Sequence, residues 1–118
     1  MKTWIDPKTS LEWQINPPEP PGAWKGAKNY AESLGDDWRL PTIEELESLL
    51  DRSRHDPSIR EEVPFQDPLD YWSSITYAND MFYAWCVYFY DGSVSDNYKG
   101  EGCYVRCVRG EINFKGLT

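Results

Sequence analysis

Most of the residues that could do chemistry are carboxylates, and they are concentrated in the segment 36–51, DDWRLPTIEELESLLD. Carboxylates at this density could hold a cation or act as general acids and bases. Either role needs another ligand or catalytic partner, and no motif in the chain supplies one. We therefore interpret the run as the solvated side of a helix, with Glu45 used at the helix start. The acidic residues of the run are Asp36, Asp37, Glu44, Glu45, Glu47 and Asp51.

The remaining candidate catalytic groups are one histidine and three cysteines. His55 lies in a polar loop between an arginine and an aspartate, without the nucleophile that a catalytic histidine accompanies. Cys86, Cys103 and Cys107 lack metal-ligand spacing such as Cys-x-x-Cys, so the sequence indicates neither a metal site nor a cofactor. Reduced thiols are the expectation. A bridge from Cys86 to Cys103 or to Cys107 stays open as the alternative for an exported protein.

The segment 77–104 combines aromatic rings with small polar side chains. Tyrosine beside Asn, Asp and Ser is typical of paratopes, where rigid rings provide contact area and polar groups provide adaptable hydrogen bonds. The sequence therefore predicts a ligand-binding surface here, and no catalytic residues. Trp72, Trp85 and Phe89 are instead expected in the core. The predicted binding residues are Tyr77, Asn79, Asp80, Tyr83, Tyr88, Tyr90, Ser95, Asn97 and Tyr98.

Two helices are predicted before this surface. Trp24, Ala27, Ala31 and Leu34 have helical spacing, and Gly35 follows as a helix end. A second helix begins at Thr42-x-x-Glu45, which has the form of a capping box. Its apolar positions are Ile43, Leu46, Leu49 and Leu50, and its acidic stripe is Glu44, Glu47 and Asp51.

The other segments predict strands and connections. Residues 4–5 and 11–13 flank a turn and predict a hairpin, and the proline-rich segment 16–22 predicts a stiff extended connector. Segment 52–68 predicts a polar connection with one helical turn at 58–62. Segments 71–77, 83–90 and 103–110 predict strands, with a turn at Asp91-Gly92. In the last segment, Val105 and Cys107 should face one side and Arg106 and Val108 the other.

Composition limits the domain count and the partners. A chain of 118 residues forms one domain, residues 1–118, and its order of elements indicates an α+β fold. The net charge of −8 argues against nucleic acid as a partner. No apolar run is long enough to span a membrane, and residues 1–10 show no signal peptide, so cytoplasmic localisation is the expectation. An extracellular or phage-particle location and a homo-oligomer stay open.

Four ordered blocks resemble a known bacterial domain family. These are WIDPxTxLxWQ at 4–14, DWRLPTIEEL at 37–46, YWSSxTYA at 71–78 and YVRCVRG at 104–110. The chain is similar, over residues 4–110, to the family of unknown function typified by the C-terminal domain of the Lcl collagen-like adhesin. The resemblance implies a C-type-lectin-like fold, related to formylglycine-generating enzymes and to retroelement variable proteins. It implies two helices packed on a twisted antiparallel sheet with long irregular loops, with Arg39, Arg106 and Arg109 as framework arginines.

These observations lead to one main hypothesis and two alternatives. The main hypothesis is a non-enzymatic recognition domain that binds a protein or glycan through residues 77–104. The first alternative is an enzyme of the formylglycine-generating type, for which Cys86 with Cys103 or Cys107 would be the only available thiol pair. The second alternative is a structural subunit of a phage or secretion particle. The sequence lacks the Glu-Pro-Asn and Trp-Asn-Asp motifs of sugar-binding C-type lectins.

Overall fold

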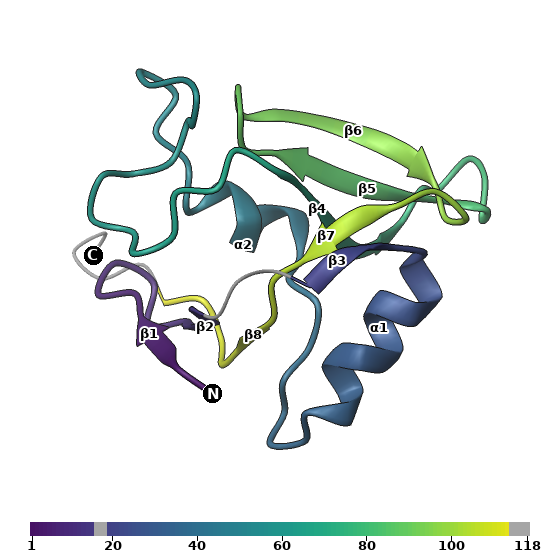
Figure 1. Ribbon diagram of the computed structural model, residues 1–118, viewed down its shortest axis with the longest axis horizontal. Helices are drawn as coiled ribbons and strands as arrows, with labels where there is room; N and C mark the ends of the chain where they lie inside the picture. The colour runs from purple at the N-terminus through teal and green to yellow at the C-terminus, as the bar shows by residue number, and fades with distance from the viewer. Residues whose placement is uncertain (16–18, 114–118) are drawn as a thin grey trace.

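The computed structural model of the protein describes residues 1–15 and 19–113 (Figure 1). Two helices and two mostly antiparallel sheets make an α+β domain, consistent with the C-type-lectin-like fold. The helices are α1 (Trp24–Ser33) and α2 (Ile43–Glu47). The strands are β1 (Thr3–Ile5), β2 (Glu12–Gln14), β3 (Glu19–Gly22), β4 (Asp70–Thr76), β5 (Tyr83–Tyr88), β6 (Ser93–Tyr98), β7 (Cys103–Val105) and β8 (Val108–Arg109).

The small sheet joins the two ends of the domain, and the large sheet carries its second half. The small sheet has the order β1-β2-β8, and the large one has the order β3-β7-β4-β5-β6. Neighbouring strands are antiparallel except β4 and β7, which are parallel. In Figure 1, α1 lies below the large sheet near β3, whereas α2 lies on the other side of β4 and β7.

The N-terminal hairpin is confirmed, and part of the proline-rich segment is a strand. Trp4 pairs with Trp13 across β1 and β2. Residues 16–18 of the expected connector lie outside the described residues. Residues 19–22 form β3, which pairs with β7 at the edge of the large sheet. An edge strand tolerates proline because one of its sides needs no backbone donor.

Helix α1 has the predicted buried face. Ala27 and Ala31 are buried, and Trp24 and Leu34 pack against the same cluster. The helix ends where Gly35 adopts a φ of 67°, a left-handed conformation that costs glycine little.

Helix α2 starts as predicted but is shorter than the apolar pattern suggested. The Thr42 hydroxyl accepts a hydrogen bond from the Glu45 N–H, and the Glu45 carboxylate accepts one from the Thr42 N–H. The helix ends at Glu47 because Leu50 pairs instead with Ile59 in an antiparallel bridge. Asp51 therefore lies outside the helix. This same bridge replaces the helical turn predicted at 58–62, and that prediction was wrong.

The segment 103–110 is two strands rather than one. β7 belongs to the large sheet and β8 to the small one, and the chain changes sheets at residues 106–107. There the side chain of Gln14 takes the place of a strand partner: its Oε1 accepts a hydrogen bond from the Cys107 N–H at 3.2 Å. The predicted alternation of faces nevertheless holds, because Val105 and Cys107 lie in one core cluster and Val108 lies in the other.

The core has two parts, one on each face of the large sheet. One packs Trp13, Leu46 and Phe89 on the α2 side, and the other packs Trp38 and Trp72 on the α1 side. Trp72 and Phe89 are buried as predicted. Trp85, also expected in the core, is only partly buried: it belongs to neither core cluster and packs against Tyr77.

The three arginines hold the framework, as the resemblance implied. Arg39 donates two hydrogen bonds to the Glu45 carboxylate, at 2.6 and 2.7 Å. The buried Arg106 donates to the Gln14 carbonyl at 2.8 Å and lies 4.0 Å from the Phe65 ring centroid. Arg109 donates to a Glu12 carboxylate oxygen at 2.8 Å and stacks over Trp38. The contacts of Arg106 and Arg109 join segments far apart in the chain, whereas Arg39 and Glu45 are close in sequence.

Neither helix in the described part of the chain is long and apolar enough to cross a bilayer.

Candidate functional site

The structure places eight of the nine predicted binding residues at or near the two ends of the β5–β6 hairpin, and Ser95 between them. Tyr83 pairs with Tyr98 at one end of the ladder, and Tyr88 pairs with Ser93 at the other. Six residues of strand span about 17–20 Å. Tyr77, Asn79 and Asp80 lie in or beside the loop next to the first end. None of the nine is buried, but they do not form one continuous site.

Four rings form an aromatic platform at the first end. The aromatic platform consists of Tyr77, Tyr83, Trp85 and Tyr98. Tyr77 and Trp85 meet edge to face with ring centroids 5.2 Å apart, and Tyr83 and Tyr98 do so at 5.8 Å. Tyr98 is 48% exposed. Edge-to-face contacts hold the rings in fixed orientations, so the platform is a preorganised surface.

The β4–β5 loop is held by its own polar groups. The Tyr77 N–H donates to the Tyr83 carbonyl at 2.8 Å, and Asp80 accepts a hydrogen bond from the Phe82 N–H at 2.9 Å. Asn79 donates to the Tyr77 hydroxyl at 3.3 Å. Asn79 and Asp80, predicted as ligand contacts, thus make hydrogen bonds within the loop.

This loop presents two large apolar side chains that the sequence reasoning missed. Met81 is 71% exposed and Phe82 is 63% exposed. The sequence could have indicated this, because Met81 and Phe82 are adjacent large apolar residues in a short polar loop. Side chains in such a loop do not pack into the core, so apolar ones there are expected to be exposed. Exposed apolar side chains that cluster mark interaction surfaces more often than scattered ones do.

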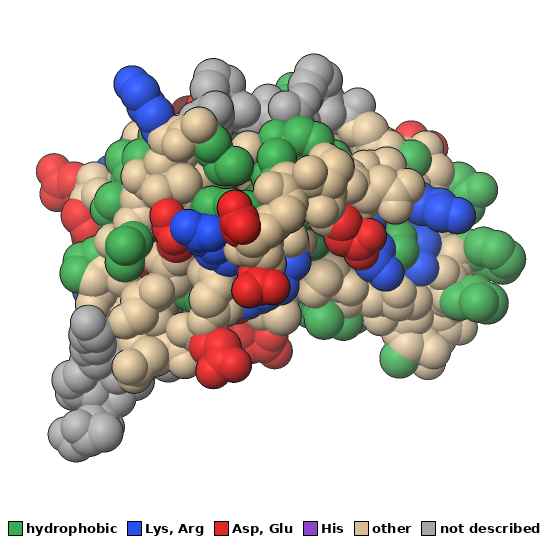
Figure 2. Space-filling model, turned by 90° about the horizontal axis from the view of Figure 1, so that it is seen from below, with side chains coloured by type: hydrophobic (Ala, Val, Ile, Leu, Met, Phe, Trp, Pro, Cys, Tyr) green, Lys and Arg blue, Asp and Glu red, His purple; other side chains and the backbone are tan. Residues whose placement is uncertain are grey.

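Met81 and Phe82 line a groove with the first turns of α1 and with Lys99. The groove has a volume of about 570 Å³, and its other lining residues are Trp24, Lys25, Lys28, Asn29 and Glu32. Figure 2 shows hydrophobic side chains beside lysine or arginine side chains at the right-hand end of the molecule, where α1 and the β4–β5 loop lie.

Lysines give this groove a positive character on an acidic protein. The Lys99 ammonium lies 4.2 Å from the Trp24 ring centroid and donates to the Thr76 hydroxyl at 3.0 Å. The Lys28 ammonium lies 5.5 Å from the same ring. With Lys25, three lysines oppose one glutamate around the groove, whereas the whole chain carries a net charge of −8.

Tyr88 and Tyr90 form a separate patch at the far end of the hairpin. Their rings stack with centroids 5.7 Å apart and an interplanar angle of 26°. Both are partly exposed, at 38% and 41%. Ser95 lies between the two ends, opposite Cys86 in the ladder.

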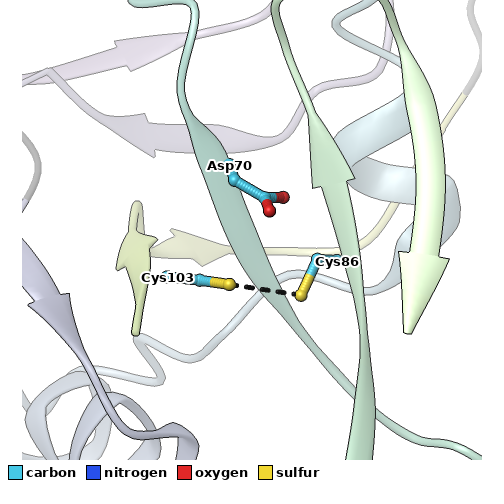
Figure 3. A group of neighbouring side chains, drawn as sticks. All are labelled: Asp70, Cys86 and Cys103. Carbon is cyan, nitrogen blue, oxygen red and sulfur yellow. Dashed lines mark hydrogen bonds between the residues drawn. The ribbon is translucent and has the colours of Figure 1, made fainter. Parts of the chain in front are cut away.

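Two cysteines and a carboxylate meet on the large sheet, although sequence spacing gave no sign of it (Figure 3). The sulfurs of Cys86 and Cys103 are 3.3 Å apart, both side chains are buried, and Asp70 points toward them. Asn97 donates to the Cys103 sulfur at 3.3 Å, so this predicted surface residue turns partly inward. Cys107 lies elsewhere in the same core cluster, and no disulfide joins any of the three cysteines.

The pKa values of the two thiols in this cluster are shifted in opposite directions. A hydrogen bond with Cys86 lowers the pKa of the Cys103 thiol, and the Asn97 amide lowers it further, against the opposing effect of burial. The same shared hydrogen bond and burial raise the pKa of Cys86. Burial also raises the pKa of Asp70, and the nearby Asp91 carboxylate adds to that increase. Either thiol can donate in the contact that the two sulfurs share.

The acidic run at residues 36–51 is largely a solvated surface. Glu44 is exposed, and Glu47 forms an exposed ion pair with Arg52 at 2.9 Å. Glu45 is the buried exception. Within residues 1–15 and 19–113, the run contributes no group of three metal-ligating side chains. His55 is exposed in its loop.

Comparison with known proteins identifies the family. No curated protein matches the chain. The Lcl C-terminal domain family matches residues 2–109, which is nearly the whole chain and includes all four sequence blocks except Gly110. The chain therefore belongs to the Lcl C-terminal domain family.

Proposed function

We propose that this domain binds a ligand without transforming it, and that the ligand occupies the groove between α1 and the β4–β5 loop. The observation that carries the proposal is the exposure of Met81 and Phe82 beside Trp24. Aromatic side chains and methionine are enriched at the centres of protein interfaces. A fixed loop that displays both next to a groove is suited to holding an apolar side chain of a partner.

The lysines around the groove indicate the charge of the ligand. Lys28 and Lys99 lie over Trp24, where a carboxylate of the ligand could pair with an ammonium while its apolar neighbour contacts the ring. Such pairing adds specificity and faster association. We therefore favour a protein segment in which an aromatic or aliphatic side chain adjoins an acidic residue.

A glycan is the second candidate, favoured by the aromatic platform. Flat rings can stack against sugar faces, and Tyr98 leaves about half of its surface open. A glycan held there would depend on Tyr98 more than on the lysines.

Catalysis by the thiol pair has less support. A nucleophilic cysteine needs a thiolate that substrate can reach. The side chains of Cys86 and Cys103 are buried, at 0% and 1% exposure. Their burial supports a non-enzymatic role.

The test is a displayed peptide library and a glycan array, each probed with the wild-type domain and three variants. Phe82→Ala removes the groove wall, Tyr98→Ala removes a platform ring, and Ile5→Ala is the matched control at an equally exposed apolar residue on β1. We expect enriched peptides to carry acidic residues beside apolar ones and to bind Phe82→Ala about 10- to 100-fold more weakly, corresponding to roughly 1–3 kcal/mol. The Ile5→Ala variant should bind like wild type.

Loss of glycan binding in Tyr98→Ala, without peptide enrichment, would favour the glycan. Ligands that bind all three variants equally would place the site elsewhere on the domain.

A further inference from the structure

Three metal-binding atoms from three different strands converge on one face of the large sheet. Cys86 lies on β5, Cys103 on β7 and Asp70 on β4. Their two sulfurs and a carboxylate oxygen all lie within 4.8 Å of one another. Figure 3 shows the three side chains pointing toward a common space. Two thiolates and a carboxylate are ligands that zinc accepts.

The carboxylate of Asp70 lacks a compensating positive charge. Its Oδ1 atom is buried and has no hydrogen-bond partner, and it joins none of the ion pairs found among the described residues. Burial raises the pKa of Asp70 and the nearby Asp91 carboxylate adds to the increase, whereas a hydrogen bond with the Cys103 thiol only partly opposes it. A partly buried carboxylate in this setting costs stability unless a cation neutralises it.

Two simpler explanations account for only part of the arrangement of the two thiols and the carboxylate. Free cysteines often fill cores as small apolar side chains, which explains the burial of both thiols but not the carboxylate aimed at them. A disulfide would remove the thiol hydrogen bond of Asp70 and leave its carboxylate without a cation. It would also need the two sulfurs about 2.05 Å apart, well below the observed 3.3 Å.

We propose that Cys86, Cys103 and Asp70 bind one divalent metal ion of the zinc class, which joins β4, β5 and β7. A tetrahedral ion with metal–sulfur bonds of about 2.3 Å places its two sulfurs about 3.8 Å apart. The observed 3.3 Å separation needs to widen by only about 0.5 Å to reach that value. A linear two-coordinate ion would need a separation of about 4.6 Å, twice the same bond length, so the geometry favours the tetrahedral ion.

The surroundings supply the other requirements of such a site. Asn97 donates to the Cys103 sulfur and orients it, as outer-shell hydrogen bonds do for metal ligands. Asp70 and Asn97 are only partly buried, which leaves an approach from solvent. Binding displaces the protons of the thiols to solvent, and no electron transfer is involved. The ion would hold β4, β5 and β7 together, and the proposal does not depend on the ligand groove.

The experiment uses the full chain, reduced and freed of metal with a chelator, and titrated with Zn²⁺ alone or with Co²⁺ as a spectroscopic probe. We expect one ion per chain, thiolate-to-cobalt charge-transfer absorption, release of protons and a higher melting temperature with Zn²⁺. Asp70→Asn should weaken Zn²⁺ binding at least 10-fold, and Cys86→Ala should remove the charge-transfer band. Cys107→Ala is the matched control, because it removes a buried thiol of the same core cluster that lies outside the site, and it should bind like wild type.

Three results would overturn the proposal. They are the absence of saturable Zn²⁺ binding, Zn²⁺ binding that Asp70→Asn and Cys86→Ala leave unchanged, and a Cys86–Cys103 disulfide that forms in air and cannot be prevented by prior Zn²⁺ loading. Because Asp70→Asn preserves side-chain size, it tests the site even if a cysteine variant fails to fold.

Discussion

Glu45→Gln tests whether the one buried carboxylate of the acidic run holds the framework together. Glu45 accepts hydrogen bonds from both terminal nitrogens of Arg39, at 2.6 and 2.7 Å, and from the Thr42 N–H at 2.8 Å. Glutamine has nearly the same shape and keeps one acceptor oxygen. Its amide NH₂ replaces the second oxygen and faces a guanidinium donor, so one hydrogen bond is lost and the other two lose their charge assistance.

The magnitude follows from those contacts. A hydrogen bond to a charged group contributes about 1.5–3 kcal/mol. Losing one and weakening two would approach the roughly 3–5 kcal/mol of a broken buried ion pair. The side chain of Arg39 is 38% exposed, however, so water can solvate its freed nitrogens. We therefore expect Glu45→Gln to lower the free energy of unfolding by about 2–3 kcal/mol.

The pH dependence gives a second measure of the same contact. Burial raises the pKa of Glu45, but the hydrogen bonds from Arg39 and Thr42 outweigh it, so the net pKa in the folded protein is lowered. A lowered folded pKa stabilises the protein above the unfolded pKa, and that contribution is lost as the pH falls through the folded pKa. The difference in the free energy of unfolding between wild type and Glu45→Gln should therefore be largest at neutral pH and become smaller in acid.

The assay is urea unfolding of wild type, Glu45→Gln and the matched control Glu44→Gln, at neutral and acidic pH. Glu44 precedes Glu45 in the same helical turn but is exposed, so its substitution should change stability by only about 0.3–1 kcal/mol, through the helix dipole. Equal midpoints for the two variants, or a Glu45→Gln deficit that does not depend on pH, would refute the reasoning.

Three further predictions concern the core, the metal cluster and the binding surface. Trp38→Ala should destabilise the domain by about 3–5 kcal/mol, because it empties a buried site beneath Arg109; a melting temperature close to that of wild type would contradict this. Asp70→Asn should stabilise the metal-free protein at neutral pH, since a raised folded pKa makes stability fall as pH rises from about 4 through that pKa. Melting curves should show that gain disappearing in acid, and a gain that persists there would exclude Asp70 ionisation as its cause. If the ligand is a glycan on the aromatic platform, Tyr98→Ala should weaken its capture while Tyr88→Ala preserves it, because the two rings lie at opposite ends of the hairpin; binding isotherms with equal losses would point to a ligand that spans both ends.

Local patterns in the sequence were enough to predict the elements that depend on neighbouring residues. The capping box at Thr42 and the turn at Gly92 involve contacts within a few positions along the chain, and the buried face of α1 is marked by apolar residues at helical spacing. The length of α2 could not be predicted in this way. Leu50 continues the helical apolar pattern, but its pairing with Ile59 after an intervening loop ends the helix earlier.

The sequence by itself determined the α+β class, the family and the ring-rich character of the second half, because composition, periodicity and ordered motifs carry that information. Only the tertiary structure decided that eight of the nine predicted binding residues divide between two ends of a hairpin, and that Met81 and Phe82 line a lysine-rimmed groove. It likewise decided that Cys86, Cys103 and Asp70 meet. The physical reason is that these arrangements depend on which strands are neighbours in the sheet. Strand order is fixed by packing between distant segments, so spacing along the chain does not reveal it.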